Sequence, residues 1–214
     1  MDQFEKDLSA QDELGLFLDR TLYPYLRADL PISFERVNAK EWQAAGVDVI
    51  LHEGERQTYF DEKAQLHYIN KPRDSFAFEI DYFYGTEWKL GWFVNDELKT
   101  RYYVLVWILE STNSDPTTVR ESDFQKVECV FIRKDKLRAW VEGFGLTREK
   151  MLDTAREMRE TNETLRQTGV DGVRFYRSKA SKYHEMPTNL VIQKKYLDAL
   201  AERHYIVTRE SCVD

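Results

Sequence analysis

Hydrophobic and polar positions recur with two different periods along the chain, and the change of period separates the predicted elements. Apolar residues stand at helical spacing over 12–23 (DELGLFLDRTLY), which predicts a helix that Pro24 closes. Further along, the period shortens to two. The segments VDVILHE (47–53) and QTYFDEKAQLHYI (57–69) predict two strands, and EGER (53–56) predicts a tight hairpin turn between them.

The rest of the chain alternates between strand-like and helix-like segments. An almost unbroken apolar run, TRYYVLVWIL (100–109), is typical of a strand covered on both faces. The other expected strands are 76–84, 126–132, 189–193 and 204–208, and the other expected helices are 134–144, 147–167 and 194–202. This order predicts an α/β fold with a central mixed sheet flanked by helices. We expect one domain over 1–214, with a core at about 11–144 and 188–208 and a helical elaboration at about 147–167.

Composition places the chain among globular proteins. Of its 214 residues 42% are hydrophobic and 14% aromatic, which is ample material for a core. No apolar run approaches the roughly 20 residues needed to cross a bilayer, and the acidic start MDQFEKDLSAQDE lacks the layout of a signal peptide. The two cysteines suggest neither a disulfide framework nor a zinc site. We therefore expect a cytoplasmic protein without a membrane partner.

Charge is distributed unevenly around a formal total of −7. Residues 1–62 carry 14 acids against 6 Lys+Arg, whereas residues 126–195 carry 16 Lys+Arg against 10 acids. A negative total is compatible with a DNA enzyme if acids hold a metal and bases line the substrate path. The alternative is an ordinary scatter of solvated charges.

One group of polar residues falls on the predicted hairpin. Asp48 lies within an apolar strand segment, where an acid is out of place as a packing residue. Asp61, Lys63 and Gln65 stand at i, i+2 and i+4 of the next strand, so we expect them to share a face. A turn at 53–56 would bring Asp48 opposite Asp61. Two carboxylates and a lysine would then converge.

Such a group suits phosphodiester hydrolysis, but each member also has a simpler explanation. Carboxylates can hold a metal that lowers the pKa of a water, and a cation can offset the charge that builds up on phosphorus. Asp48 could instead cap a turn. Asp61 and Lys63 could form an exposed ion pair that contributes little to stability.

The same residues resemble the PD-(D/E)XK, or restriction-endonuclease-like, nuclease superfamily. Its motif is an Asp on one strand followed by Asp/Glu-x-Lys on the next, after an N-terminal helix, which here matches Asp48 and Asp61-Glu62-Lys63. One departure is Val47, which stands where the motif has proline. The flanking segments are also similar to bacterial and phage members: EWQAAGVDV (41–49), FDEKAQLHYIN (60–70), SFAFEI (75–80), GWFVNDELKTRYYVLVWI (91–108) and NLVIQKKYLDALAERHYIV (189–207).

The resemblance implies a restriction-endonuclease-like core (αβββαβ) and a role for each motif residue. Asp48 and Asp61 would bind Mg²⁺ or Mn²⁺, and the carbonyl of Glu62 could add an oxygen ligand. Lys63 would position the attacking water or stabilise the transition state. Gln65 would extend the motif and contact metal-bound water or the backbone.

The resemblance further implies a DNA substrate, with RNA left open, and is compatible with a homodimer. A third acid often comes from the first helix, and either Glu13 or Asp19 could supply it. Several polar and basic residues could contact the substrate, although surface bases are usually only solvated: Arg36, Gln43, Lys99, Arg101, Lys179 and Lys182.

We therefore expect a Mg²⁺- or Mn²⁺-dependent endonuclease that hydrolyses DNA. The alternative is a catalytically inactive protein that uses the same fold to bind protein or nucleic acid, because a fold alone does not fix a function.

Overall fold

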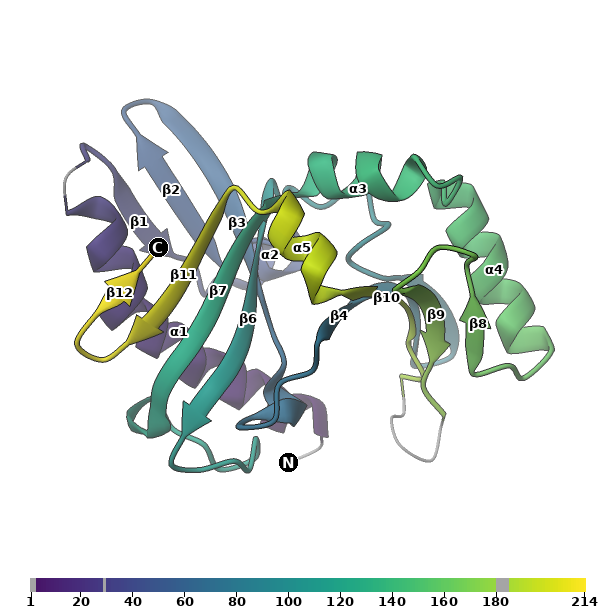
Figure 1. The fold of residues 1–214 in the computed structure, drawn as a ribbon, viewed down its shortest axis with the longest axis horizontal. Helices are drawn as coiled ribbons and strands as arrows, with labels where there is room; N and C mark the ends of the chain where they lie inside the picture. The colour runs from purple at the N-terminus through teal and green to yellow at the C-terminus, as the bar shows by residue number, and fades with distance from the viewer. Residues whose placement is uncertain (1–2, 29, 180–184) are drawn as a thin grey trace. The chain divides into compact units, whose positions relative to one another are not determined.

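The computed structural model describes residues 3–28, 30–179 and 185–214, with side chains from Ser9 onward. The chain divides into two compact units: unit 1 comprises Met1–Arg73, Lys99–Lys134 and Ala201–Asp214, and unit 2 comprises Asp74–Leu98 and Asp135–Leu200. It is an α/β protein with a curled, mixed seven-stranded half-barrel sheet in unit 1 and an antiparallel sheet in unit 2 (Figure 1). The expectation of one domain stays a prediction, because two compact units can belong to one domain.

The sheet of unit 1 has the strand order β1-β2-β3-β6-β7-β11-β12. Only β3 and β6 run parallel, and every other pair of neighbours is antiparallel. The expected strand at 100–109 and the expected strand at 126–132 are both present, as β6 and β7. The strands are β1 (Ser33–Arg36), β2 (Val49–Glu53), β3 (Arg56–Ala64), β6 (Tyr102–Ser111), β7 (Phe124–Arg133), β11 (Arg203–Thr208) and β12 (Cys212–Val213).

Helix α1 (Gln3–Arg27) covers one face of this sheet. Its apolar residues pack against one set of alternating strand positions, which includes Phe60 of β3 and Val104 of β6. Since strand side chains alternate, Glu62 faces the helix, while Asp61 and Lys63 face the opposite side. Unit 1 also holds α2 (Lys40–Ala44) and the short 3₁₀ helices η1 (Leu66–Tyr68) and η2 (Glu121–Asp123).

The expected end of the first helix at Pro24 is wrong. The helix continues to Arg27 with the proline inside it. Leu22 and Tyr23 are buried, and Leu26 packs against the same core. This packing outweighs the hydrogen bond that proline cannot donate.

The predicted hairpin is confirmed, including its register. Glu53 pairs with Arg56 across a two-residue turn, and Val49 pairs with Phe60. The turn needs a residue with positive φ, which Gly54 supplies with φ 60°. The strand pairing ends there and the N–H of Asp48 donates to the carbonyl of Phe60, so the placement of Asp48 directly opposite Asp61 stays a prediction.

Unit 2 has a sheet of five antiparallel strands in the order β5-β4-β10-β9-β8. Helix α4 begins as expected, since the Thr147 side chain accepts a hydrogen bond from the Lys150 N–H. The strands are β4 (Ser75–Tyr84), β5 (Glu87–Leu90), β8 (Leu165–Gln167), β9 (Val173–Arg177) and β10 (Thr188–Gln193). The helices are α3 (Lys134–Glu142), α4 (Arg148–Glu160) and α5 (Lys194–Leu200).

Two further expectations are corrected. The predicted helix over 147–167 ends at Glu160, because Asn162 adopts a positive φ of 55° and 165–167 pairs with β9 as β8. The predicted strand at 76–84 exists as β4, but it belongs to the sheet of unit 2 rather than to that of the hairpin.

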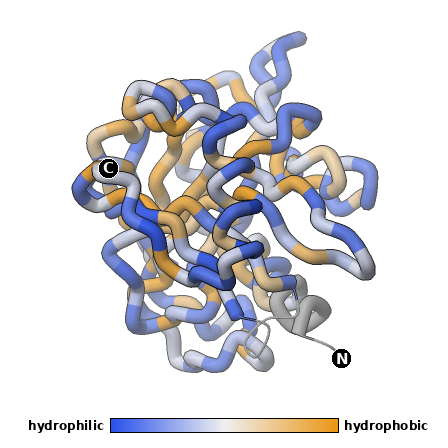
Figure 2. The backbone as a smooth tube through the Cα atoms, turned by 90° about the vertical axis from the view of Figure 1, so that its right-hand side faces the viewer, coloured by the Kyte–Doolittle hydropathy of each residue, from blue (hydrophilic) through white to orange (hydrophobic). Residues whose placement is uncertain are grey.

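None of the helices in the described part of the chain has the length and hydrophobicity that a membrane span requires. Along the tube of Figure 2, hydrophobic stretches alternate with hydrophilic loops, as expected for strands whose side chains are largely buried.

Candidate metal centre

Asp48 lies at the entrance to β2 and is fixed by its backbone. Its N–H donates to the carbonyl of Phe60 (2.9 Å), and its carbonyl accepts from the N–H of Val37 (2.9 Å). Its side chain also has a fixed partner, because Oδ2 accepts a hydrogen bond from the backbone N–H of Glu62 (2.7 Å). The carboxylate is therefore directed toward β3.

Asp61 and Lys63 lie on β3, on the face of the sheet opposite α1. Lys63 Nζ donates to Asp61 Oδ1. The Asp61 side chain is only 2% exposed, compared with 25% for Lys63. Asp61 Oδ2 is buried and has no hydrogen-bond partner in the part of the chain that the structure describes. A buried oxygen of this kind is costly unless something binds it.

The carboxyl group of Asp48 is perturbed by its surroundings. Burial and the nearby charge of Asp61 raise the pKa of the Asp48 carboxyl from 3.8 to about 6. Lys63 and the Glu62 N–H act in the opposite direction without cancelling the rise. Two carboxylates that repel each other at neutral pH favour a bound cation.

These residues fit a divalent metal ion. Mg²⁺ and Mn²⁺ prefer oxygen ligands, and Asp48 and Asp61 offer carboxylate oxygens from adjacent strands. The unpartnered Asp61 Oδ2 is the specific observation that favours a ligand at this point. The carbonyl of Glu62 as a further ligand stays a prediction.

The side chain of Glu62 lies on the α1 face, away from Asp61. Both of its oxygens bind Arg36, and one accepts a hydrogen bond from the hydroxyl of Tyr23. Arg36 also binds Asp19, so neither Arg36 nor Asp19 is directed to the Asp61 face in this conformation. This network was missed in the sequence analysis. Its signal was that Glu62 shares a strand face with the apolar residues Phe60 and Ala64.

Glu13, the other helix acid that could join the site, has partners elsewhere. Its Oε2 accepts a hydrogen bond from the Glu121 N–H (2.7 Å), and its Oε1 binds Arg120 (3.3 Å). It stabilises the start of η2.

Gln65 lies one residue beyond the end of β3, so its place on the face of Asp61 as a strand residue stays a prediction. Strand β3 ends at Ala64, and Gln65 has φ −85° and ψ 58° ahead of η1. Its Oε1 accepts from the Arg73 N–H (2.8 Å), and its Nε2 donates to the Arg73 carbonyl (3.5 Å). Gln65 thus holds the loop that leaves the site.

Three of the predicted substrate residues are exposed in segments next to the candidate metal ligands. Gln43 lies on α2, just before Asp48, and Lys99 Nζ lies 4.5 Å from the ring centroid of Trp42. The N–H of Arg101 donates to the carbonyl of Tyr59 (2.9 Å), which ties Arg101 to β3. Substrate contact by these residues stays a prediction. Lys179 is exposed in unit 2, and Lys182 lies outside the described residues.

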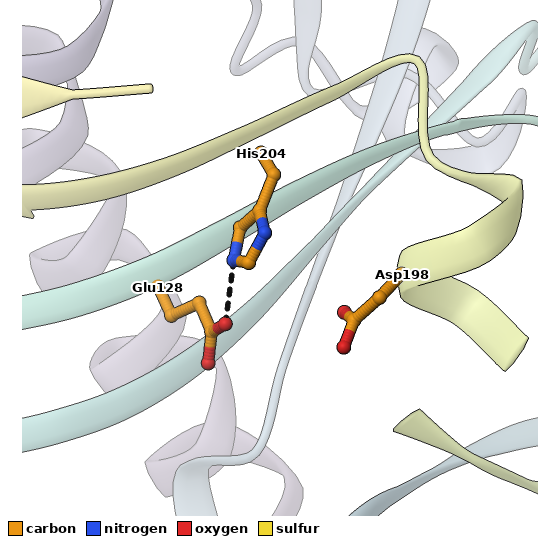
Figure 3. A group of neighbouring side chains, drawn as sticks. All are labelled: Glu128, Asp198 and His204. Atoms are coloured by element: carbon orange, nitrogen blue, oxygen red, sulfur yellow. Dashed lines mark hydrogen bonds and ion pairs between the residues drawn. The ribbon is translucent and has the colours of Figure 1, made fainter. Parts of the chain in front are cut away.

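A second titratable pair lies on the Asp61 face of the same sheet and was not expected from the scattered histidines. His204 of β11 pairs with Val130 of β7, Val130 pairs with Leu105 of β6, and Leu105 pairs with Lys63 of β3. Residues paired in this way across a sheet lie on the same face. His204 Nε2 lies 2.5 Å from Glu128 Oε1 (Figure 3). The third side chain drawn, Asp198, belongs to unit 2.

Comparison with known proteins identifies no relative of this chain. No family model matches the sequence, and neither the curated proteins nor the solved structures include a match.

Proposed function

We propose that the protein is a Mg²⁺- or Mn²⁺-dependent nuclease that hydrolyses phosphodiester bonds of DNA at the Asp48–Asp61–Lys63 site. The observation that carries the proposal is the convergence of two carboxyl groups across the β2–β3 hairpin, with Asp61 Oδ2 buried and unpartnered. A purely structural ion pair would need only Asp61 and Lys63. It would not explain a second, half-buried acid beside them.

Each residue has a distinct task in this proposal. Asp48 and Asp61 would hold the cation, which when bound supplies a water of lowered pKa. Lys63 carries a positive charge on the same face and would stabilise the charge that develops on the phosphate oxygens. The Glu62 N–H holds the Asp48 carboxylate in place.

The cations near the site support an anionic substrate. Lys99 and Arg101 are exposed, and both precede β6, the strand that pairs with β3. Basic residues next to a metal site suit the phosphate backbone of nucleic acid, in spite of the net charge of −7. DNA is the proposed substrate, and RNA remains an outcome of the test.

The restriction-endonuclease-like core is part of this proposal. The elements α1, the β2–β3 hairpin and the parallel strand β6 follow one another in the order that such a core requires. The departure lies between β3 and β6, where the αβββαβ core has a helix but the described chain passes through η1 and through β4 and β5 of unit 2. An insertion at that point leaves the hairpin and its acids intact.

The test is cleavage of plasmid and single-stranded DNA and RNA with Mg²⁺ or Mn²⁺. Asp61→Ala and Lys63→Ala should both abolish metal-dependent cutting. Glu87→Gln and Lys89→Met are matched controls, because Glu87 and Lys89 form an ion pair at the same spacing on β5 but are 65% and 44% exposed. These controls should cut like the wild type.

A catalytically silent binding protein is the competing function. The ion pair of Lys63 with Asp61 favours it, because the lysine occupies one oxygen that a cation could use. Mn²⁺ titration separates the two. Binding that Asp61→Ala abolishes supports the nuclease, whereas no Mn²⁺ binding and no cutting of any substrate would overturn it.

A further inference from the structure

Glu62 is a buried glutamate whose environment requires partners. It is 4% exposed and lies between Asp61 and Lys63, with its side chain among the apolar residues that α1 covers. A carboxylate in such a place is strongly destabilising unless it is paired and hydrogen-bonded. Tyr23 and Arg36 supply those partners. Tyr23 Oη donates to Glu62 Oε1 (2.5 Å), and Arg36 donates to both Glu62 oxygens (2.8 and 3.0 Å).

Arg36 joins β3 to helix α1 through the same guanidinium. It donates to both oxygens of Asp19 (2.7 and 2.9 Å) and to the carbonyl of Gly15 (3.1 Å). Burial alone would lower the pKa of Arg36, but the Glu62 carboxylate outweighs it and raises the pKa above its ordinary value. The guanidinium is thus fixed between helix and strand. We call the set of Tyr23, Arg36 and Glu62 the Glu62 clamp.

Gly15 permits this close approach. A Cβ at that position would lie 2.8 Å from Arg36 Cζ and 2.9 Å from its Nη1, which is closer than ordinary contacts allow. A side chain at this position would therefore force the Arg36 guanidinium to shift away from its partners.

The clamp and the candidate metal site share one residue of β3. On the α1 face the side chain of Glu62 is held by three hydrogen bonds from Tyr23 and Arg36. Its backbone N–H donates to Asp48 Oδ2 (2.7 Å). Any shift of residue 62 therefore moves the donor that orients Asp48.

We propose that the Glu62 clamp positions the Asp48 carboxylate for the metal ion, so that Arg36 and Glu62 are positioning residues of the site. The inference rests on the proposed function. Groups that orient metal ligands in this way typically change metal affinity about 10- to 100-fold when they are removed.

A purely stabilising role is the competing explanation, and the chain offers a matched comparison. Glu121 is a second buried glutamate of unit 1, held by Arg20 (2.7 Å) and Arg209 (3.1 Å). Glu121 and these arginines lie at α1, η2 and the β11–β12 turn, away from Asp48 and Asp61. If buried ion pairs mattered here only for stability, removing either network would have the same consequences.

The experiment replaces each network by apolar residues, which often preserves folding because no charge is left buried. The clamp variant is Tyr23→Phe/Arg36→Met/Glu62→Met, and the control is Glu121→Met/Arg209→Met. Arg36→Lys is a milder variant that keeps the charge but loses the bidentate geometry. Circular dichroism and thermal unfolding would establish that each variant is folded.

Two readouts follow. In metal-free protein, hydrogen exchange of the residue 62 amide should be at least about tenfold faster in the clamp variant than in a control of equal stability. In the same proteins, Mn²⁺ affinity should fall about tenfold or more in the clamp variant, less in Arg36→Lys and within twofold in the control.

The readouts also separate failure of the inference from failure of the proposed function. Unchanged amide exchange in the folded clamp variant would overturn the clamp, whether or not the wild type binds metal or cuts DNA. Faster exchange in a protein that never binds Mn²⁺ would overturn the proposed nuclease and, with it, any role of the clamp in metal binding.

Discussion

The same short pattern, an acid followed two residues later by lysine, occurs in both units with different consequences. In unit 1 Asp61 and Lys63 lie on β3, where the Asp61 side chain is 2% exposed. In unit 2 Glu87 and Lys89 lie on β5, where both side chains are largely exposed. Both pairs form an ion pair on one face of a strand.

The difference lies in what faces each pair. Near Asp61 lies Asp48, a second acid whose pKa is raised by burial and by the charge of Asp61. The residue opposite Glu87 is Tyr84, which is 60% exposed. The triplet alone therefore predicts nothing, and its chemistry depends on burial and on the partner strand.

The largest effect on DNA cleavage is expected when Asp61 is replaced. We expect Asp61→Asn to lower the rate of metal-dependent DNA cleavage by about 10³-fold or more, because a metal ligand accounts for several kcal/mol of transition-state stabilisation. Glu87→Gln, the same type of change in unit 2, should leave the rate unchanged. Plasmid nicking in Mg²⁺ measures both, and equal loss in the two variants would abolish the distinction between the triplets.

Replacement of the lysine should have the next largest effect. We expect Lys63→Met to lower kcat by about 10²- to 10³-fold, as for removal of one group that stabilises transition-state charge. Mn²⁺ affinity should stay the same or rise, since Lys63 no longer competes for Asp61. Lys89→Met is the control. Loss of Mn²⁺ binding in Lys63→Met would indicate that the lysine supports the site rather than the reaction.

The hairpin could be predicted from the sequence because its determinants are local. Alternating apolar positions and Gly54 fix both the strands and their register, which the pairing of Val49 with Phe60 confirms. The placement of β4 was not predictable in this way. Its pattern identifies a strand, but which sheet it joins depends on pairing with β10, more than 100 residues away.

The site could be predicted only in part, for a similar reason. The alternation of β3 correctly separates Asp61 and Lys63 from Glu62, but the helix acids could not be assigned. Asp19 binds Arg36, a contact between α1 and an edge strand that no spacing rule reveals. The strand predicted over 57–69 ends at Ala64, because Gln65 leaves the extended conformation ahead of η1.

A third prediction concerns stability and pH. Because the pKa of Asp48 in the folded protein is about 6, above its ordinary value of 3.8, ionisation of this carboxyl opposes folding. The metal-free wild type should therefore lose stability as pH rises from about 4 to above 6. The Asp48→Asn variant should not lose stability in this pH range, because asparagine does not ionise. Its side-chain oxygen can still accept the hydrogen bond from the Glu62 N–H.

We expect Asp48→Asn to be more stable than the wild type in EDTA at pH 8 by about 1–3 kcal/mol. The difference in stability between Asp48→Asn and the wild type should shrink toward pH 4. The Asp48→Asn variant should also lack cleavage activity, because it loses a metal ligand. Urea unfolding at several pH values measures the difference in stability. An advantage independent of pH would mean that the repulsion between Asp48 and Asp61 is not its source.

The smallest expected effect comes from building the missing partner into unit 2. Tyr84→Asp would place an acid opposite Glu87 and so copy the charge pattern of the β2–β3 hairpin. Because these side chains are exposed, water competes for the cation, and we expect Mn²⁺ binding no tighter than about millimolar and no DNA cleavage. Isothermal titration of this variant in an Asp61→Asn background isolates the new site.

Binding as tight as that of the wild-type hairpin would show that the charge pattern suffices and that burial of Asp61 contributes little. Weak or absent binding would assign the difference between the two triplets to burial and to the fixed orientation of Asp48.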